Sequence, residues 1–188
     1  MAAGSSSRLG SLKQLVKLND KLLIEIAIEN ALAVAPHTDI YVVLGANFLL
    51  IAPKIYKYEV NILENLKWEI GMSTSVILGL TNSLDAVGVM FMVADQPLIP
   101  KSHFTEMISK FNSQKIIATK FEENLGVPML VPKLFFEEIL SKVKGDRGAA
   151  FLLRKHPMNV EFVVCPQAKF DVDTQEDLDL MRGGKEGL

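Results

Sequence analysis

The feature that most constrains the fold is an almost continuous apolar run at residues 86–94, set among other short apolar segments. The run is too short for the roughly 20 residues of a membrane-spanning helix. It is typical of a strand covered by helices on both faces, because such a strand has no solvent-facing side that calls for polar residues. Residues 39–46 are rich in β-branched and aromatic side chains, and residues 60–63 form another apolar run. These segments predict buried strands.

Segments with helical periodicity alternate with these strands. Apolar residues recur at a helical spacing over 21–35, and 47–58 and 74–84 have the same character. Such alternation predicts right-handed crossovers and an α/β fold with a mainly parallel sheet and helices on both faces. The second half of the chain continues the pattern, with helices predicted at 101–111, 133–143, 149–155 and 174–181 and strands at 115–120, 128–131 and 160–165.

Proline positions and chain length refine this prediction. Pro128 and Pro132 bracket one predicted strand, which we therefore expect near an edge of the sheet, since proline cannot donate to a ladder. The 188 residues contain no internal repeat or long linker, which favours a single domain over 1–188. Only Met1–Ala3 precede the first glycine, whereas a doubly wound sheet opens with a strand of about four to six residues. Either the first strand is truncated or residues precede Met1.

Charge and cysteine content exclude several functions. Lys and Arg number 20 and Asp and Glu number 22, a net charge of -2, so no general attraction to nucleic acid or an anionic membrane exists. An anionic ligand would need a local site. The single Cys165 excludes an internal disulfide, and the three histidines show no zinc-ligand spacing. Because no secretory or membrane-spanning segment is evident, we expect a cytoplasmic protein.

The segment 2–10 is a loop of glycine and small residues that contains Arg8 and is followed by Lys13. Successive backbone N–H groups in such loops close on phosphate oxygens, and nearby cations neutralise the charge. The spacing differs from that of the P-loop and of the dinucleotide fingerprint. This segment predicts a phosphate site, and a flexible terminus is the alternative.

Asp95 comes directly after the apolar run. The carboxyl end of a central strand is where open α/β sheets place ligands and divalent ions. The alternative is that Asp95 only caps a turn before Pro97.

A pair of late carboxylates, Asp171 and Asp173, lies two residues apart, so in an extended segment both face one side and could converge on one ion. The residues that follow have a structural role of their own, because Thr174 and Asp177 predict a capping box at the start of the last helix.

Two glycine-containing segments complete the set. Residues 71–76 open a predicted helix with Ser73 or Thr74 as its N-cap, and they leave further N–H groups and hydroxyls for a base or ribose. The glycines at 145 and 148 predict a turn over residues 145–148, and such a turn can be purely structural.

In this order, the segments resemble the molybdenum-cofactor nucleotidyltransferase family, and most closely the molybdenum cofactor cytidylyltransferases. The resemblance covers nearly the whole chain, and seven motifs in the family's order argue against coincidence. The motifs are Ala2-Ala3-Gly4 through Arg8-Leu9-Gly10, Lys13-Gln14-Leu15, Gly71-Met72-Ser73-Thr74-Ser75, Ala94-Asp95-Gln96-Pro97, Gly126-Val127-Pro128, Gly145-Asp146-Arg147-Gly148-Ala149 and Asp171-Val172-Asp173-Thr174.

The resemblance implies a single-domain Rossmann-like nucleotidyltransferase fold and a role for each motif. The catalytic residues would be Arg8, Lys13 and Asp95. Magnesium would be bound by Asp95 with help from Asp171 and Asp173, and the acceptor by Asp146 and Arg147. The nucleotide would be bound by Ala2, Ala3, Gly4, Arg8, Lys13, Gly71, Ser73 and Ser75.

Two positions depart from the family pattern. Leu12 stands where the family usually has proline, and Ala150 stands where an arginine commonly follows Gly-Ala. The second departure concerns recognition of the acceptor more than the nucleotide chemistry.

The implied reaction transfers a nucleoside monophosphate, CMP from CTP, to the terminal phosphate of molybdopterin and releases pyrophosphate. Such transfers depend on positioning and charge neutralisation. A molybdenum-dependent oxidoreductase would receive the product, and neither nucleic acid nor a membrane is expected as a partner. The alternatives are a GTP-dependent guanylyltransferase, a nucleotidyltransferase for another small phosphate or acid, and a non-catalytic module that delivers the cofactor.

Overall fold

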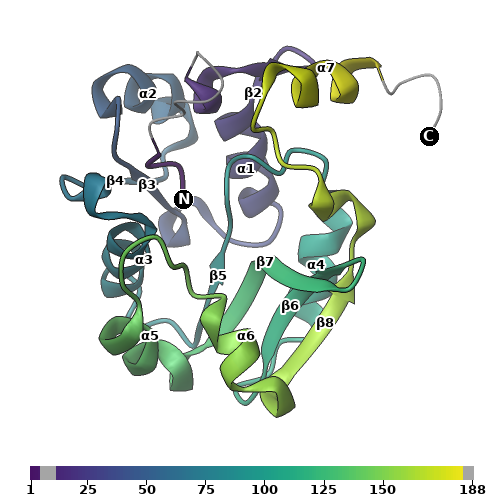
Figure 1. Ribbon diagram of the computed structural model, residues 1–188. Helices are drawn as coiled ribbons and strands as arrows, with labels where there is room; N and C mark the ends of the chain where they lie inside the picture. Colours follow the sequence, from purple (N-terminus) through teal and green to yellow (C-terminus); the bar gives the residue numbers. More distant parts are fainter. Residues whose placement is uncertain (5–11, 184–188) are drawn as a thin grey trace.

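The computed structural model describes residues 1–4 and 12–183, and its strands and helices alternate as the sequence predicts (Figure 1). The main strands are β3 (Tyr41–Leu44), β4 (Asn61–Glu64), β5 (Gly88–Phe91), β6 (Ile116–Phe121), β7 (Asn124–Pro132) and β8 (Val160–Val164). The α-helices are α1 (Leu23–Leu32), α2 (Phe48–Ile55), α3 (Met72–Thr81), α4 (Lys101–Ser109), α5 (Phe136–Lys142), α6 (Phe151–Lys155) and α7 (Gln175–Gly183). The predicted α/β class is confirmed.

The sheet is mixed rather than mainly parallel. β3 pairs in parallel with β4, and β6 pairs in parallel with β8, but β7 runs antiparallel to both β5 and β6. The strands form one group in the order β5-β7-β6-β8 and a second group of β3 and β4. Only the turn at 122–123 separates β6 from β7. So short a connection permits an antiparallel hairpin and no parallel crossover.

Pro128 does not mark an edge, because β7 lies between β5 and β6. The register of β6 against β7 shifts between Ala118 and Thr119, so that Ala118 pairs with Met129 while Thr119 pairs with Gly126. Pro128 falls in this irregularity, where no ladder N–H is needed. Its carbonyl accepts a hydrogen bond of 2.7 Å from the Thr119 hydroxyl. The edge prediction was wrong because a local bulge accommodates proline inside the sheet.

Helices cover both faces of the sheet, as predicted. Alternate residues of β6 point to opposite sides. Ile116 and Ala118 pack with residues of α3, α5 and α6, while Ile117 packs with Met107 of α4. A further buried cluster joins α1, α2 and β3. None of the described helices is long and apolar enough to cross a membrane.

The segment before α1 contains a hairpin that the sequence did not predict. β1 (Lys17–Leu18) pairs antiparallel with β2 (Lys21–Leu22), so the helix expected over 21–35 begins only at Leu23. The turn residues Asn19 and Asp20 have φ angles of 51° and 66°. Asn and Asp tolerate this left-handed region better than most side chains, which is the signal that could have indicated the turn.

Candidate active site

A pocket of about 500 Å³ opens at the carboxyl end of β5 and brings together six of the seven motifs. This is the edge at which α/β sheets place ligands. The seventh motif, Gly126-Val127-Pro128, lies within β7 and does not line the pocket. The residues of the predicted site that line it are Ala2, Ala3, Gly4, Lys13, Gly71, Ser75, Asp95, Asp146 and Asp173.

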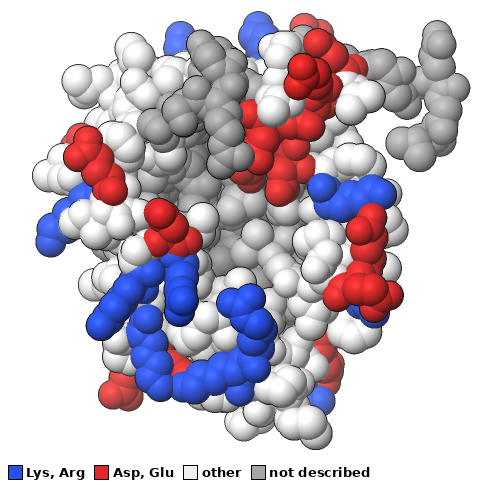
Figure 2. Space-filling view, viewed as in Figure 1, with Lys and Arg blue, Asp and Glu red and all other residues white. Residues whose placement is uncertain are grey.

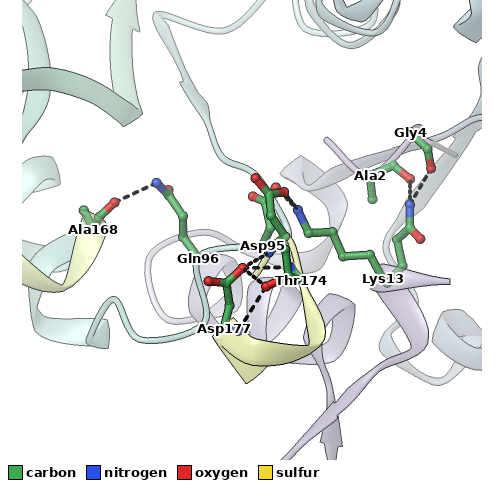
Figure 3. Close-up of polar contacts among 10 residues, drawn as sticks. Ala2, Gly4, Lys13, Asp95, Gln96, Ala168, Thr174 and Asp177 are labelled. Carbon is green, nitrogen blue, oxygen red and sulfur yellow. Dashed lines mark hydrogen bonds and ion pairs between the residues drawn. The ribbon is translucent and has the colours of Figure 1, made fainter. Parts of the chain in front are cut away.

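Gln14 holds the opening segment in place (Figure 3). Its side-chain Nε2 donates to the carbonyl oxygens of Ala2 and Gly4, both at 2.9 Å. Gln14 itself is buried. A buried amide that binds two carbonyls fixes the path of the backbone between them. The sequence reasoning assigned Gln14 no role, although the Lys13-Gln14-Leu15 motif contained it.

Lys13 lies between two carboxylates at the base of the pocket (Figure 3). Its Nζ is 2.8 Å from Oδ2 of Asp95 and 2.6 Å from Oδ1 of Asp173. Desolvation lowers the pKa of Lys13, but the hydrogen bonds with Asp173 and Asp95 outweigh it, and the pKa is raised above its usual value. The amine is therefore a cation at neutral pH, held where two carboxylates converge.

The late segment that carries Asp173 is anchored to the segment that follows β5. The N–H of Val172 donates to the carbonyl of Asp95 at 2.9 Å, and the Val172 side chain is fully buried. Asp171 does not line the pocket, but its carboxyl group is close enough for the charges of the site to affect its pKa. Desolvation first, and then the charges of Asp95 and Asp173, raise the pKa of Asp171. The three carboxylates therefore interact electrostatically.

The capping box predicted for the last helix is confirmed. Oδ2 of Asp177 accepts from the N–H of Thr174 at 2.7 Å, and the Thr174 hydroxyl accepts from the N–H of Asp177 at 3.2 Å. These bonds fix the start of α7 and with it the end of the segment that carries Asp173.

Gly71 brings two of the glycine motifs into contact. Its φ of 123° is a conformation that side chains rarely adopt, and an added Cβ would lie 2.5 Å from the carbonyl carbon of Gly145 and 2.6 Å from Oδ1 of Asp146. The N–H of Ser73 donates to the carbonyl of Gly145 at 2.9 Å. The turn at 145–148 is therefore packed against the start of α3.

The N-cap prediction for α3 was wrong. The helix begins at Met72 with Gly71 as its N-cap, so Ser73 and Thr74 lie inside its first turn. The Thr74 hydroxyl instead donates back to the carbonyl of Gly71 at 2.9 Å. Ser73 is buried and does not line the pocket, while Ser75 does.

Trp68 lines the pocket, and Asn65 supports the start of α3 beside it; the sequence reasoning missed both. Nδ2 of Asn65 donates to the hydroxyls of Thr74 and Ser75, at 2.8 and 2.9 Å. Trp68 lines the pocket beside the opening segment. An added Cβ at Gly45 would lie 2.5 Å from the Cβ of Trp68, so glycine is what permits this approach. These residues come from loops without a recognisable motif.

Besides Ser73 and Asp171, two more predicted site residues are not among the described residues that line the pocket. Arg147 is exposed and does not line the pocket, although its neighbour Asp146 does. Arg8 lies outside the residues that the structure describes.

Negative charge predominates in the pocket. Among the described residues that line it, the charged side chains are those of Glu69, Asp95, Asp146 and Asp173 and that of Lys13. Figure 2 shows carboxylates gathered beside the start of α7. Among the described residues, no group of three or more His, Cys, Asp or Glu side chains is arranged to hold a metal ion. The cation that the structure places between Asp95 and Asp173 is the amine of Lys13.

A family model described as a MobA-like NTP transferase domain matches residues 1–160. The chain belongs to this family. The matched range contains the opening segment, the start of α3, Asp95 and the turn at 145–148, so most of the pocket comes from the NTP transferase domain. Asp171 and Asp173 lie beyond it.

The chain is also similar to proteins of known name or structure. The chain is 26% identical to nicotine blue oxidoreductase of Paenarthrobacter nicotinovorans, over 95% of this chain and 92% of that protein. A nucleotidyl transferase from Methanothermobacter has a TM-score of 0.82 at 16% identity, over 96% and 93% of the two chains. Rv0371c of Mycobacterium tuberculosis, in complex with manganese, has a TM-score of 0.75 at 19% identity, over 99% and 95%. These two structures establish the shared fold.

Proposed function

We propose that the protein transfers a nucleoside monophosphate, CMP from CTP, to the terminal phosphate of a molybdopterin-type cofactor and releases pyrophosphate. The observation that carries this proposal is the position of Lys13, whose amine bridges Asp95 and Asp173 at the base of the pocket. A lysine that reaches phosphate and carboxylates that hold a divalent cation are the groups that phosphoryl transfer requires. Here they meet in one pocket of an NTP transferase domain.

The donor set fits magnesium. Asp95 and Asp173 present hard carboxylate oxygens that already converge on one cation, and Asp171 lies beside them. The complex of Rv0371c with manganese, a divalent cation of similar chemistry, gives further support. Asp95, Asp173 and Asp171 would hold the ion, which when bound neutralises charge on the phosphate oxygens.

Charge balance supports a cation requirement on independent grounds. A triphosphate brings several negative charges into a pocket whose described lining residues include four carboxylates and one lysine. Like charges at close range in a partly desolvated site repel strongly. Nucleotide binding therefore needs additional positive charge, which a divalent ion and Arg8 would supply.

The remaining residues position the nucleotide. In the proposal, the backbone of Ala2, Ala3 and Gly4 follows the triphosphate, and Lys13 with Arg8 stabilises the departing pyrophosphate. The acceptor phosphate needs no general base, because a phosphate monoester is largely ionised near neutral pH. Gly71, Ser73 and Ser75 would lie on the base and ribose side, with Ser75 supplying a hydroxyl and Ser73 acting through the packing of α3.

The acceptor would approach from the side of the turn at 145–148. The Asp146 carboxylate lines the pocket and suits the N–H donors of a pterin ring. Figure 2 shows Lys and Arg side chains gathered over α5 and α6, where they can attract an anionic acceptor. The exposed residues of this basic group are Lys142, Lys144, Arg147, Arg154 and Lys155.

Pyrophosphate release is the measurement that tests the proposal. The purified protein is incubated with magnesium and CTP, GTP or ATP, with and without molybdopterin, and kcat/KM is compared. We expect release that requires both magnesium and molybdopterin, with CTP preferred because the Ser75 hydroxyl on the pocket wall can pair with a pyrimidine edge. A GTP value at or above that of CTP would replace the cytidylyl assignment with a guanylyl one.

Two other results would overturn nucleotidyl transfer itself. Tight binding of molybdopterin without any pyrophosphate release identifies a module that delivers the cofactor. Reduction or oxidation of nicotine blue, with no pyrophosphate release from any nucleotide, assigns the chain the activity after which its Paenarthrobacter relative is named. A third result would change only the acceptor. If pyrophosphate is released with a different small phosphate or acid as acceptor, and not with molybdopterin, the nucleotidyl transfer stands and the assignment of molybdopterin as acceptor is wrong.

A further inference from the structure

β8 is the outermost strand of the four-stranded group, and its far edge has no strand partner in the described part of the chain. On its inner edge it pairs in parallel with β6. Figure 1 shows β8 at the outer side of the sheet. An edge of this kind presents a row of N–H and C=O groups that another strand can join.

The backbone groups of alternate residues in β8 point away from β6. The N–H of Cys165, directly after β8, donates to the carbonyl of Lys120 in β6 at 2.8 Å. Because successive residues of a strand face opposite edges, the odd-numbered residues of β8 face β6. The N–H and C=O groups of Val160, Phe162 and Val164 therefore face outward.

The side chains of the same three residues share one face of β8 and leave apolar surface in solvent. Phe162 is 45% exposed and Val164 is 63% exposed, and Met158, just before β8, is 88% exposed. Val163 points to the other face, where it is buried with Met107 of α4. Apolar side chains exposed singly need no explanation, but these follow an edge that can also form hydrogen bonds.

This edge is complementary to itself. When two copies of β8 meet antiparallel about a two-fold axis at Phe162, that residue faces its own counterpart, and Val160 faces Val164 of the other copy. All three are outward-facing residues, so each pair can exchange two backbone hydrogen bonds. The same register puts their apolar side chains next to each other on one face, where cross-strand pairs stabilise a sheet. Met158 then lies level with the residues that follow Val164 in the other copy.

The charges along the edge also match about this axis. Lys110, at the end of α4, forms an ion pair of 3.4 Å with Glu106 and donates to the Phe162 carbonyl at 3.5 Å. That bond is long, so the carbonyl can exchange it for one to the second copy. The Lys110 and Glu106 side chains of the two copies then meet near the axis and can pair in alternation. Glu161 of β8 is already paired with Lys115 at 2.7 Å.

We propose that β8 pairs antiparallel with β8 of a second copy of this chain, which joins the two four-stranded groups into one continuous sheet. A second copy fits this edge because hydrogen-bonding groups, apolar side chains and charges all repeat about one axis. No residue of β8 lines the pocket, so the proposal is independent of nucleotidyl transfer. The contact is at the small end of specific interfaces, so the dimer should depend on protein concentration.

Mass and amide exchange of the full chain test the pairing. Light scattering should give the mass of one chain at about 1 µM and of two chains at about 200 µM. Exchange of the amides of Val160, Phe162 and Val164 should be at least about tenfold slower at the higher concentration. The amides of Glu161 and Val163 face β6, so their exchange should not respond to concentration.

A charge on the edge should separate the copies without unfolding them. Val164→Glu places a carboxylate beside Lys120 in the register with β6, which suits the single chain. In the dimer the same carboxylate would lie against Val160 of the other copy, so association should weaken at least about tenfold. Val87→Glu, at a valine that is 72% exposed outside β8, is the matched control and should associate like the wild type. Thermal unfolding at low concentration verifies that both variants fold.

Three results would overturn the proposal. The first is the mass of a single chain at both concentrations. The second is a dimer in which exchange at Val160, Phe162 and Val164 does not change, because the contact would then lie elsewhere. The third is a folded Val164→Glu that associates as tightly as the wild type. If Val164→Glu does not fold, the mass and exchange of the wild type still decide the question.

Discussion

Lys13 and Asp173 lie 160 positions apart in the sequence, and the amine of one is 2.6 Å from a carboxylate oxygen of the other. The same amine is 2.8 Å from Asp95. The two carboxylates come from the segment after β5 and from the segment before α7, and the bond from Val172 to the backbone of Asp95 keeps them together. The two carboxylates that we propose as metal ligands therefore already converge on one cation, the amine of Lys13.

Asp95→Asn should lower turnover by roughly a hundredfold or more while the fold is kept, because the change is nearly isosteric and removes a proposed metal ligand. Turnover is measured as pyrophosphate release, and folding by thermal unfolding. Glu123→Gln, at an exposed carboxylate in the turn between β6 and β7, is the control and should match the wild type. Unchanged turnover in Asp95→Asn would remove this residue from the mechanism.

Lys13→Met should have opposite effects on the two ligands. Removal of the amine takes away one cation that Asp95 and Asp173 both bind, so Mn²⁺ should bind the nucleotide-free protein about tenfold more tightly. The triphosphate should bind at least about tenfold more weakly, because a phosphate-binding charge is lost. Calorimetric titration measures both affinities, with the exposed Lys21→Met as control. If Mn²⁺ affinity does not change, Lys13 does not compete for the cation position.

Local patterns explain why much of this molecule could be predicted. The elements from β3 to α7 follow from apolar periodicity, which depends only on neighbouring residues. The direction of β7 and the place of Pro128 depend on strand pairing and on a bulge, which periodicity does not encode. The same limit applies to the site. Asp95 follows a recognisable strand, whereas Trp68 comes to the pocket through long-range packing.

Ser73 shows that a segment can be placed correctly from the sequence while one of its residues is given the wrong role. The sequence placed Gly71–Ser75 near the nucleotide, and Gly71 and Ser75 do line the pocket. Ser73 was expected to bind the nucleotide, but its side chain is buried and its N–H donates to the carbonyl of Gly145. That contact joins residues from distant parts of the chain, so no local pattern could have revealed it.

Gly71→Ala should destabilise the protein by about 2 kcal/mol or more, because alanine is strained at this φ angle and its Cβ would collide with the turn at 145–148. Turnover should fall as the turn moves. Gly79→Ala is the matched control inside the same helix. Its Cβ would lie 3.5 Å from Cγ2 of Val43, an ordinary contact, so it should add about 0.5–1 kcal/mol of stability. Urea unfolding measures the change in the free energy of unfolding for both variants. Equal changes would show that the fit of Gly71 against the turn is unimportant.

Protonation of His103 should make stability depend on pH. His103 is buried in α4, and its Nε2 donates to the Thr119 hydroxyl at 2.8 Å, which itself donates to the carbonyl of Pro128. Desolvation lowers the pKa of His103 below its usual 6.5, although the charge of Glu106 opposes this.

The sign follows from where the proton binds. Below about pH 6.5 the unfolded chain takes up a proton that the folded protein resists, so the stability present above pH 6.5 falls as the pH drops toward the lower folded pKa. His103→Gln keeps a donor for Thr119 but does not titrate, so its free energy of unfolding should fall less than that of the wild type between about pH 7.5 and 5. Urea unfolding at several pH values measures this, with the exposed His37→Gln expected to keep the wild-type slope. Identical slopes for wild type and His103→Gln would mean that other groups govern the acid sensitivity of the fold.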